Sequence, residues 1–117
     1  MEKLPENVSF RSEAISDFRK LDGSIKKKLI KQIIKVSKRP QSKSEGGYGI
    51  PLGNKSGNNL VGYLEIKMRD DGIRCIYKCV KDDNFGMDVI IISVRADEKV
   101  YYEAKRRIEN EERKVCF

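Results

Sequence analysis

The sequence contains no histidine and no tryptophan, and only three of its residues are cysteine. Histidine is the commonest general acid and base in enzymes and the commonest zinc ligand. Any chemistry must therefore use lysine, arginine, tyrosine or carboxylate side chains, and we expect no metal and no cofactor. The cysteines, Cys75, Cys79 and Cys116, are odd in number and form no C-x-x-C pair. Free thiols of this kind are typical of a reducing compartment and predict a cytoplasmic protein.

Long hydrophobic runs are also missing. No apolar run reaches the roughly 18 residues that a transmembrane helix needs, so we expect none. The first five residues, Met-Glu-Lys-Leu-Pro, lack the apolar core of a secretory signal. No repeat or low-complexity tract interrupts the 117 residues, and this length fits one domain over residues 1–117.

Positive charge is abundant. Lysine and arginine number 25 against 18 acidic residues, which gives a net charge of +7 at pH 7. In so small a protein this excess favours a polyanionic partner such as a nucleic acid. A merely solvated basic surface would give the same composition, and it stands as the alternative. Hydrophobic residues make up 38% of the chain and fall in regular patterns, which predicts a folded protein.

Two amphipathic helices are predicted near the N-terminus, over residues 12–22 and 24–38, from apolar residues at helical spacing. Ser12 is the expected N-cap of the first helix, and Pro40 ends the second. The outer side of the second helix carries six lysines, which are Lys26, Lys27, Lys28, Lys31, Lys35 and Lys38. We interpret them as a solvated helix face in preference to an RNA-binding surface.

The rest of the chain predicts strands and one more helix. Residues 41–59 are rich in glycine, serine and asparagine and predict a loop, whose glycines fit neither nucleotide-binding glycine motif. Three strands are expected at residues 61–69, 73–81 and 87–95, with a short edge strand near residues 8–10 and a charged helix over residues 97–113. The sequence therefore predicts an α+β fold in which two N-terminal helices pack on an antiparallel sheet of about four strands, followed by a C-terminal helix.

Asp71-Gly72 is a strong hairpin signal between the first two of these strands. If these two residues form the loop, Arg69 faces Arg74 and Glu65 faces Lys78, the latter as a surface salt bridge. Side chains alternate between the two faces of a sheet, so one face is apolar. The other face carries Glu65, Lys67, Arg69, Arg74 and Lys78.

The expected pair of arginines suggests an anion site. Like charges across a ladder are mildly destabilising, so folding alone would not select them. Guanidinium groups match phosphate oxygens, which favours a phosphate site over two splayed surface arginines. The third strand, residues 87–95, is almost continuously apolar and is expected to be central and covered on both faces, with Arg95 at its end.

Several motifs along the chain resemble the RelE/ParE toxin superfamily. They are Ala14-x-x-x-Phe18-x-x-Leu21-Asp22, Gly49-x-Pro51-Leu52, Leu60-x-Gly62, the segment from Ile66 to Tyr77, Ile92-Ser93-Val94-Arg95, and Val100-Tyr101-x-x-Ala104-x-x-Arg107. Their order and spacing carry the resemblance over most of the sequence. It implies two helices on a curved sheet, a cognate antitoxin, and one of two activities. RelE-like members cut messenger RNA on the ribosome, whereas ParE-like members inhibit DNA gyrase.

The resemblance also implies site residues. The strand lysine of RelE-like members falls on Lys67, and their C-terminal tyrosine on Tyr101. The phosphate-binding arginines fall on Arg69, Arg74 and Arg95. A second strand lysine of some members would fall on Glu65, where a glutamate offers a possible base instead. We add Lys78 as a phosphate-binding candidate because it shares the charged face.

These residues suggest a metal-free endoribonuclease in which the RNA 2′-hydroxyl attacks its own 3′-phosphate. Arg74 and Arg95 would hold the phosphate with help from Arg69, and Tyr101 would stack on a base or orient the sugar. Either Lys67 or Glu65 would take the 2′-hydroxyl proton. Two alternatives stay open, a gyrase inhibitor without chemistry and a plain nucleic-acid-binding module.

Overall fold

The computed structural model describes residues 4–55, 57–81, 85–94 and 99–115. Its elements follow one another as β1 (Val8–Phe10), α1 (Ser12–Arg19), α2 (Gly23–Ser37), the 3-10 helix η1 (Lys43–Glu45), β2 (Ile50–Lys55), β3 (Asn58–Met68), the 3-10 helix η2 (Arg69–Asp71), β4 (Ile73–Lys81), β5 (Phe85–Ser93) and α3 (Lys99–Val115). The α+β class predicted from the sequence is confirmed. Among the helices of the described residues, none has the length and apolarity needed to cross a membrane.

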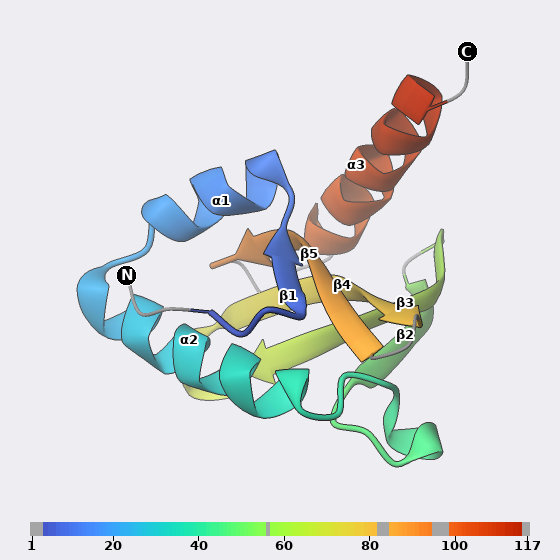
Figure 1. Ribbon diagram of the computed structural model, residues 1–117. Coiled ribbons are helices and arrows are strands. Elements are labelled where there is room, and N and C mark those ends of the chain that lie inside the picture. The colour runs from blue at the N-terminus through green and yellow to red at the C-terminus, as the bar shows by residue number, and fades with distance from the viewer. Residues whose placement is uncertain (1–3, 56, 82–84, 95–98, 116–117) are drawn as a thin grey trace.

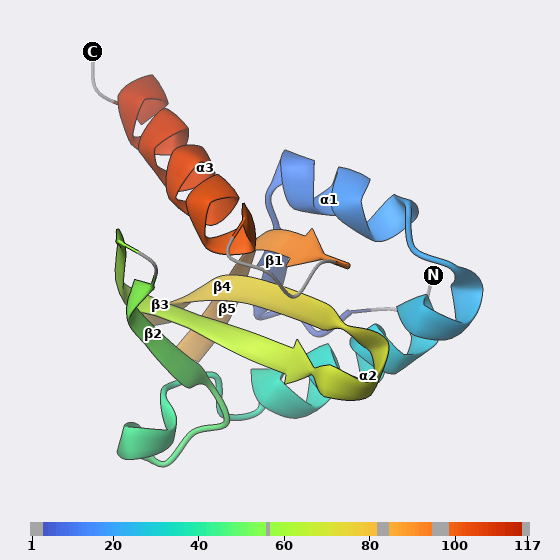
Figure 2. The same cartoon turned by 180° about the vertical axis from the view of Figure 1, so that it is seen from behind.

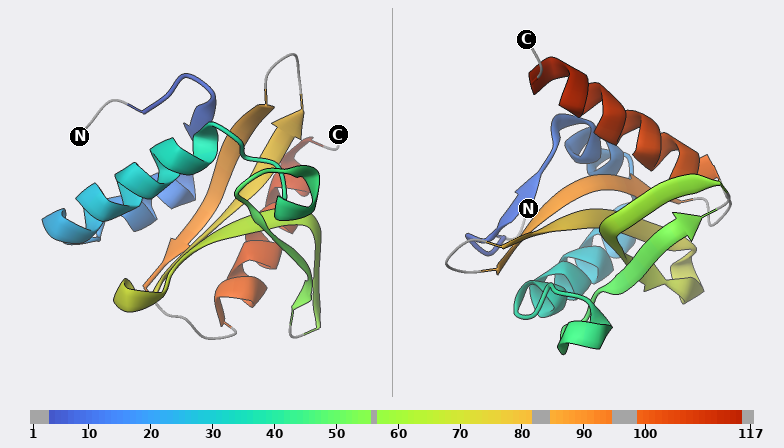
Figure 3. Two further views of the ribbon diagram at one scale, coloured as in Figure 1. Left: turned by 90° about the horizontal axis from the view of Figure 1, so that it is seen from below. Right: turned by 90° about the vertical axis from the view of Figure 1, so that its right-hand side faces the viewer.

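The sheet has five strands in the order β1-β5-β4-β3-β2 and is visibly curved (Figures 1 and 3). Strand β1 runs parallel to β5, while the other neighbours are antiparallel, so the sheet is mixed. The extra strand is β2, and the prediction of a loop over residues 41–59 is wrong there. Proline is tolerated in this strand because β2 lies at the sheet edge, and the pairing with β3 shifts between Pro51 and Gly53.

Helices cover both faces of the sheet. Helices α1 and α2 lie against one face and α3 lies against the other, as Figures 1 and 2 show from opposite sides. Strand β5 lies inside the sheet, between β1 and β4, and is covered on both faces as expected: Val89 and Ile92 belong to the core under α1 and α2, and Ile90 and Ile91 to the core under α3. An uninterrupted apolar run is what a strand between two cores requires.

The two N-terminal helices are close to their predicted positions, but their ends differ. The residue that precedes α1 is Arg11, whose side chain makes no capping hydrogen bond, so the prediction of Ser12 as N-cap is wrong. Helix α2 begins after Asp22, whose Oδ1 accepts a hydrogen bond from the Ile25 amide at 3.0 Å. Asp22 is therefore the N-cap of α2, which begins one residue before the predicted start at residue 24.

The β3–β4 hairpin has a longer turn than the sequence suggested. Residues 69–71 form η2, and Gly72 closes the turn in the left-handed region with φ of 68°. Lys67 is consequently paired with Arg74, and Glu65 with Ile76. The predicted pairs Arg69–Arg74 and Glu65–Lys78 are both wrong. The slip is two residues, however, so the side chains within the two strands keep the faces that were predicted for them, whereas Arg69 lies in η2 and outside the sheet.

One close backbone approach fixes the start of β2 beside β3. The Tyr77 hydroxyl is buried and donates a hydrogen bond to the Pro40 carbonyl oxygen at 2.8 Å. Gly49 passes directly over this hydroxyl and over Leu64, and a Cβ atom at position 49 would collide with both. A glycine before β2 is therefore needed to bring Ile50 opposite Glu65.

Candidate functional site

Four polar side chains meet on the α3 side of the sheet, and we call them the site cluster: Glu65, Lys67, Arg74 and Tyr101. Strand β3 carries Glu65 and Lys67 on one face because residues two apart point the same way. Strand β4 places Arg74 directly opposite Lys67. Tyr101 comes from the first turn of α3, which packs against β3 and β5. Two neighbouring strands and the C-terminal helix thus build the cluster.

Glu65 is the centre of the cluster. Its Oε1 lies 3.4 Å from Lys67 Nζ and 3.5 Å from Arg74 Nη1. Its Oε2 accepts a hydrogen bond from the Tyr101 hydroxyl at 3.3 Å. Arg74 Nη1 in turn donates to the Tyr101 oxygen at 2.9 Å, which is the shortest of these contacts. The 3.5 Å contact is too long for a strong hydrogen bond, so Glu65 and Arg74 interact mainly through charge.

The carboxylate of the cluster is more deeply buried than the two cations. The Glu65 side chain is 0% exposed, whereas the side chains of Lys67 and Arg74 keep 23% and 21% of their surface in solvent. One negative and two positive charges leave the cluster with a net charge of +1. An anion arriving from solvent therefore reaches the two cations and not the carboxylate, which favours phosphate binding at the outer side of the cluster.

The Tyr101 hydroxyl is held in its neutral form. Burial, followed by the negative charge of Glu65, raises the pKa of Tyr101 above its ordinary value near 10, although the Arg74 guanidinium acts in the opposite direction. The hydroxyl consequently stays protonated at neutral pH and donates a hydrogen bond. Tyr101 is 9% exposed and packs with Val100 and Ala104 in the core under α3, so it has a structural role as well.

Two other predicted site residues, Arg69 and Lys78, lie outside the cluster. Arg69 is exposed in η2 and is not opposite Arg74. Lys78 is exposed on the expected face, opposite Tyr63. It is four residues from Arg74 along β4, which separates the two by about 13 Å at the usual rise of a strand. Arg95 lies outside the described residues.

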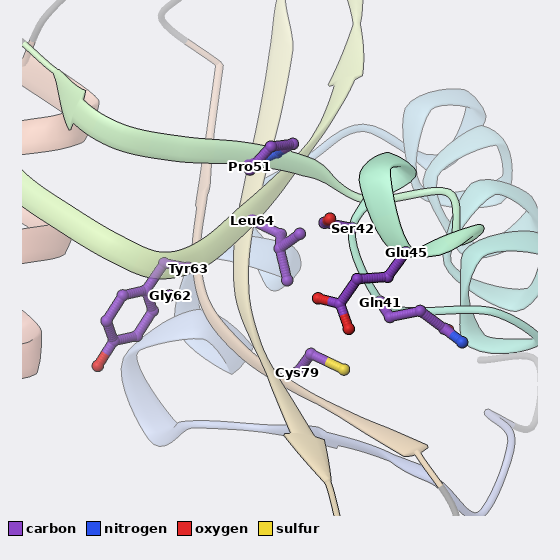
Figure 4. A pocket seen from close by; sticks show the side chains of 8 residues that line it. All are labelled: Gln41, Ser42, Glu45, Pro51, Gly62, Tyr63, Leu64 and Cys79. Carbon is purple, nitrogen blue, oxygen red and sulfur yellow. The ribbon is translucent and has the colours of Figure 1, made fainter.

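Two pockets adjoin the strands of the site. Lys67 and Arg69 line an open groove of about 650 Å³ with residues of α2 and η1, among them Lys28, Lys31 and Lys43. A smaller pocket of about 310 Å³ lies between residues 41–45 and strands β3 and β4, and the side chain of Glu45 points into it (Figure 4). The residues that line this second pocket include that carboxylate and no cationic side chain, so it is unfavourable for phosphate.

Ion pairs that sequence reasoning missed hold α3 in place. Arg107 Nη1 lies 2.7 Å from Asp17 Oδ2 and 2.9 Å from the Ile90 carbonyl oxygen, and Arg107 Nη2 lies 3.2 Å from Asp17 Oδ1. Asp17 Oδ2 also accepts a hydrogen bond from the Ile92 amide at 3.0 Å. Helix α1, strand β5 and helix α3 are therefore joined at one largely buried pair. Because α3 carries Tyr101, this pair positions the site cluster from a distance.

The fold and the cluster define a small basic α+β protein with a candidate phosphate-binding site and no histidine. No family model matches the chain. It is similar to the mRNA interferase toxin RelE of Escherichia coli (strain K12), with 27% identity over 101 residues that cover 86% of this chain and 95% of the relative. The mRNA interferase RelE of Shigella flexneri shows the same identity and coverage.

Solved structures agree with the sequence comparison. A double mutant of the E. coli toxin RelE in the free state matches 86% of this chain and 95% of its own, at 27% identity and a TM-score of 0.62. The same mutant in complex with an antitoxin peptide matches at 25% identity and a TM-score of 0.58, over 83% of this chain and 90% of its own. The resemblance to RelE toxins expected from the motifs is confirmed, and so is the fold that it implied.

Proposed function

We propose that this chain is the toxin of a toxin–antitoxin pair and a metal-independent endoribonuclease that cuts messenger RNA on the ribosome. One observation carries the proposal: Lys67, Arg74 and Tyr101 converge within one cluster, with the outer parts of both cations open to solvent. These are the positions that the resemblance assigned to the RelE site. Both curated relatives are named mRNA interferases, which supports this activity class.

In the proposed reaction the RNA itself supplies the nucleophile. The 2′-oxygen attacks the adjacent phosphorus, and the bond from phosphorus to the 5′-oxygen breaks. The products are a 2′,3′-cyclic phosphate and a 5′-hydroxyl. One proton leaves the 2′-hydroxyl and one reaches the 5′-oxygen. The protein must align these atoms and stabilise the extra negative charge on the phosphorane, and the Arg74 and Lys67 cations lie where they can do both.

The geometry favours different roles for the two candidate bases. Lys67 is partly exposed to solvent, so we assign to it the acceptance of the 2′-hydroxyl proton. Only the neutral amine can accept this proton, so the ammonium must first lose its own. Glu65 is fully buried and surrounded by three partners, so we assign it the positioning of Arg74 and Tyr101. The neutral Tyr101 hydroxyl, or its ring, orients the sugar or base. Arg69, Lys78 and Arg95 complete the proposed set as further phosphate-binding residues.

The proposed partners follow from the same function. A cognate antitoxin would mask the toxin, and a solved complex of the E. coli toxin RelE with an antitoxin peptide supports such a partner. The substrate would be messenger RNA held by the ribosome, to whose RNA a protein of net charge +7 is attracted over long range. The site of action would be the cytoplasm, where translation takes place.

The proposal is tested by expressing the wild type and Arg74→Ala from a tightly controlled promoter. Growth is followed, and primer extension maps breaks in a translated message. We expect the wild type to stop growth and cut the message, and Arg74→Ala to do neither while keeping its circular dichroism spectrum. Arg39→Ala, which removes an exposed arginine outside the site cluster, is the matched control and should behave as the wild type. Growth arrest with intact messages and altered DNA supercoiling would favour gyrase inhibition instead.

A further inference from the structure

The structure divides the lysines of α2 into two sets. Lys28 and Lys31 line the groove of about 650 Å³ beside the β3–β4 turn, whereas Lys27 and Lys38 are exposed elsewhere on the helix or at its end. The turn lies beside α2, as Figure 2 shows, and Lys28 Nζ reaches Asp71 Oδ1 at 3.3 Å. The sequence suggested that this whole helix face is solvated, but one part of the face forms a wall of the groove.

Positive charge dominates this groove, which we call the basic groove. Its cations are Lys28, Lys31, Lys43, Lys67 and Arg69, and its carboxylates are Asp70 and Asp71. Five positive and two negative charges leave a net charge of +3. In the Lys28–Asp71 ion pair the lysine side chain is exposed to solvent, so the pair contributes little to stability. Within the described part of the chain, no carboxylate forms an ion pair with Lys31, Lys43 or Arg69.

The basic groove is continuous with the site cluster. Lys67 belongs to both, since its Nζ contacts Glu65 in the cluster and the residue is one of those that line the groove. Strand β2 begins at Ile50, opposite Glu65, so β2 does not pair with β3 beyond that point. This end of β3 therefore connects the α3 face of the sheet, where the cluster lies, with the α2 face, where the groove lies.

We propose that the basic groove binds the sugar–phosphate backbone of the messenger RNA segment next to the cleaved phosphate. This inference rests on the proposed function and adds a substrate-binding surface to it. A phosphate held by Lys67 and Arg74 leaves the neighbouring phosphates of the same strand within reach of the groove. Among the described residues, three groove cations without an acidic partner, Lys31, Lys43 and Arg69, provide the charge that a single strand requires. The smaller pocket in Figure 4 is lined by no cation and offers no competing path.

The test compares two double variants of equal charge. Lys31→Ala with Lys43→Ala removes two groove lysines, and Lys27→Ala with Lys38→Ala removes two exposed lysines that do not line the groove. The probe is a short, fluorescently labelled single-stranded RNA in which every 2′-hydroxyl is methylated, so that it binds without being cut. Its dissociation constant is measured by anisotropy over a range of salt concentrations.

We expect the groove variant, Lys31→Ala with Lys43→Ala, to bind the RNA probe more weakly than the wild type. Its dissociation constant should also depend less on salt concentration. Two lost phosphate contacts should reduce the slope of log K against log salt by about 1.4, at roughly 0.7 for each contact with a single strand. The control variant should change the slope by less than half of that amount. Equal slopes in both variants would overturn the inference, as would a wild type that does not bind the probe.

Two further outcomes separate this inference from the proposed function. If the groove variant binds the probe as the wild type does but sediments less with ribosomes, the groove contacts ribosomal RNA and the inference is wrong. If the slope changes as expected while wild-type expression leaves messages intact, the groove binds single-stranded RNA and the nuclease proposal fails. The growth and primer-extension experiment with Arg74→Ala answers the second question independently of the groove lysines.

Discussion

Replacing Glu65 tests whether this residue positions the site or acts as its base. Glu65→Ala removes the carboxylate that contacts Lys67, Arg74 and Tyr101 in the site cluster. Glu65→Gln keeps the shape and one oxygen that accepts hydrogen bonds, but it cannot accept a proton in the reaction. A positioning residue should tolerate the glutamine and not the alanine, whereas a base should tolerate neither.

The expected magnitudes follow from burial. Removing one partner of a buried ion pair costs about 3–5 kcal/mol. Lys67 and Arg74 keep 23% and 21% of their side-chain surface in water, so we expect the lower end, about 3 kcal/mol, for Glu65→Ala. For Glu65→Gln we expect a loss of about 1–2 kcal/mol, because hydrogen bonds to charged partners become bonds to a neutral amide. Misplacing Arg74 and Tyr101 should slow cleavage about 100-fold in the alanine variant.

The assay combines urea denaturation with the pH dependence of cleavage on translating ribosomes. Positioning predicts that Glu65→Gln keeps cleavage within about tenfold of the wild type and keeps the acidic limb of the pH–rate profile. General-base catalysis is worth about 100-fold or more. A loss of that size in Glu65→Gln, with no acidic limb and no more than the expected loss of stability of about 1–2 kcal/mol, would show that Glu65 takes the proton and would refute the assignment to Lys67.

Three further predictions concern the surroundings of the site cluster. Tyr101→Phe removes the hydroxyl that accepts from Arg74 and donates to Glu65, so cleavage should fall at least about tenfold, with a loss of about 1–3 kcal/mol of stability; unchanged cleavage would show that the hydroxyl has no part in the reaction. Arg107→Lys loses the two-pronged contact with Asp17, which should lower the melting temperature and cleavage together, while Arg106→Lys, an exposed control, should alter neither. Burial raises the pKa of Cys75 from near 9 to about 12, so the thiol ionises at lower pH in the unfolded chain than in the folded one. The free energy of unfolding should therefore fall by up to about 1.4 kcal/mol per pH unit between these two values. In urea titrations at alkaline pH, Cys75→Ala should make this decrease smaller.

The hairpin shows which part of the site was predictable from the sequence. Alternation along β3 and β4 depends on a period of two, so the face of Glu65, Lys67 and Arg74 could be predicted without knowing the turn. The cross-strand partners depend on the length of the turn, and Asp71-Gly72 suggested two loop residues where η2 and Gly72 make a longer connection. The predicted arginine pair was wrong for this reason, although the phosphate-binding face that it suggested carries the site cluster.

Two other features depend on contacts between distant segments and leave little trace in the sequence. Strand β2 contains a proline and a glycine with positive φ, which are typical of loops, and it forms because the edge of β3 pairs with it. The burial of Glu65 likewise depends on Tyr101 of α3, 36 residues away along the chain. Sequence reasoning therefore placed Glu65 in a surface salt bridge with Lys78, and only the docking of α3 shows that it is buried.

The position of that buried carboxylate itself argues for a function. Glu65 lies next to apolar residues of the core under α3, such as Ile76 opposite it on β4, where a hydrophobic side chain would avoid the cost of removing a charge from water. The ion pairs offset this cost only in part, because they are long and because both cations remain partly in solvent. A fold selected for stability alone would not place a carboxylate there. A site that must hold an arginine and a tyrosine in fixed positions until a phosphate arrives needs such a group. Helix α3, which the Arg107–Asp17 ion pair holds in place, covers this carboxylate.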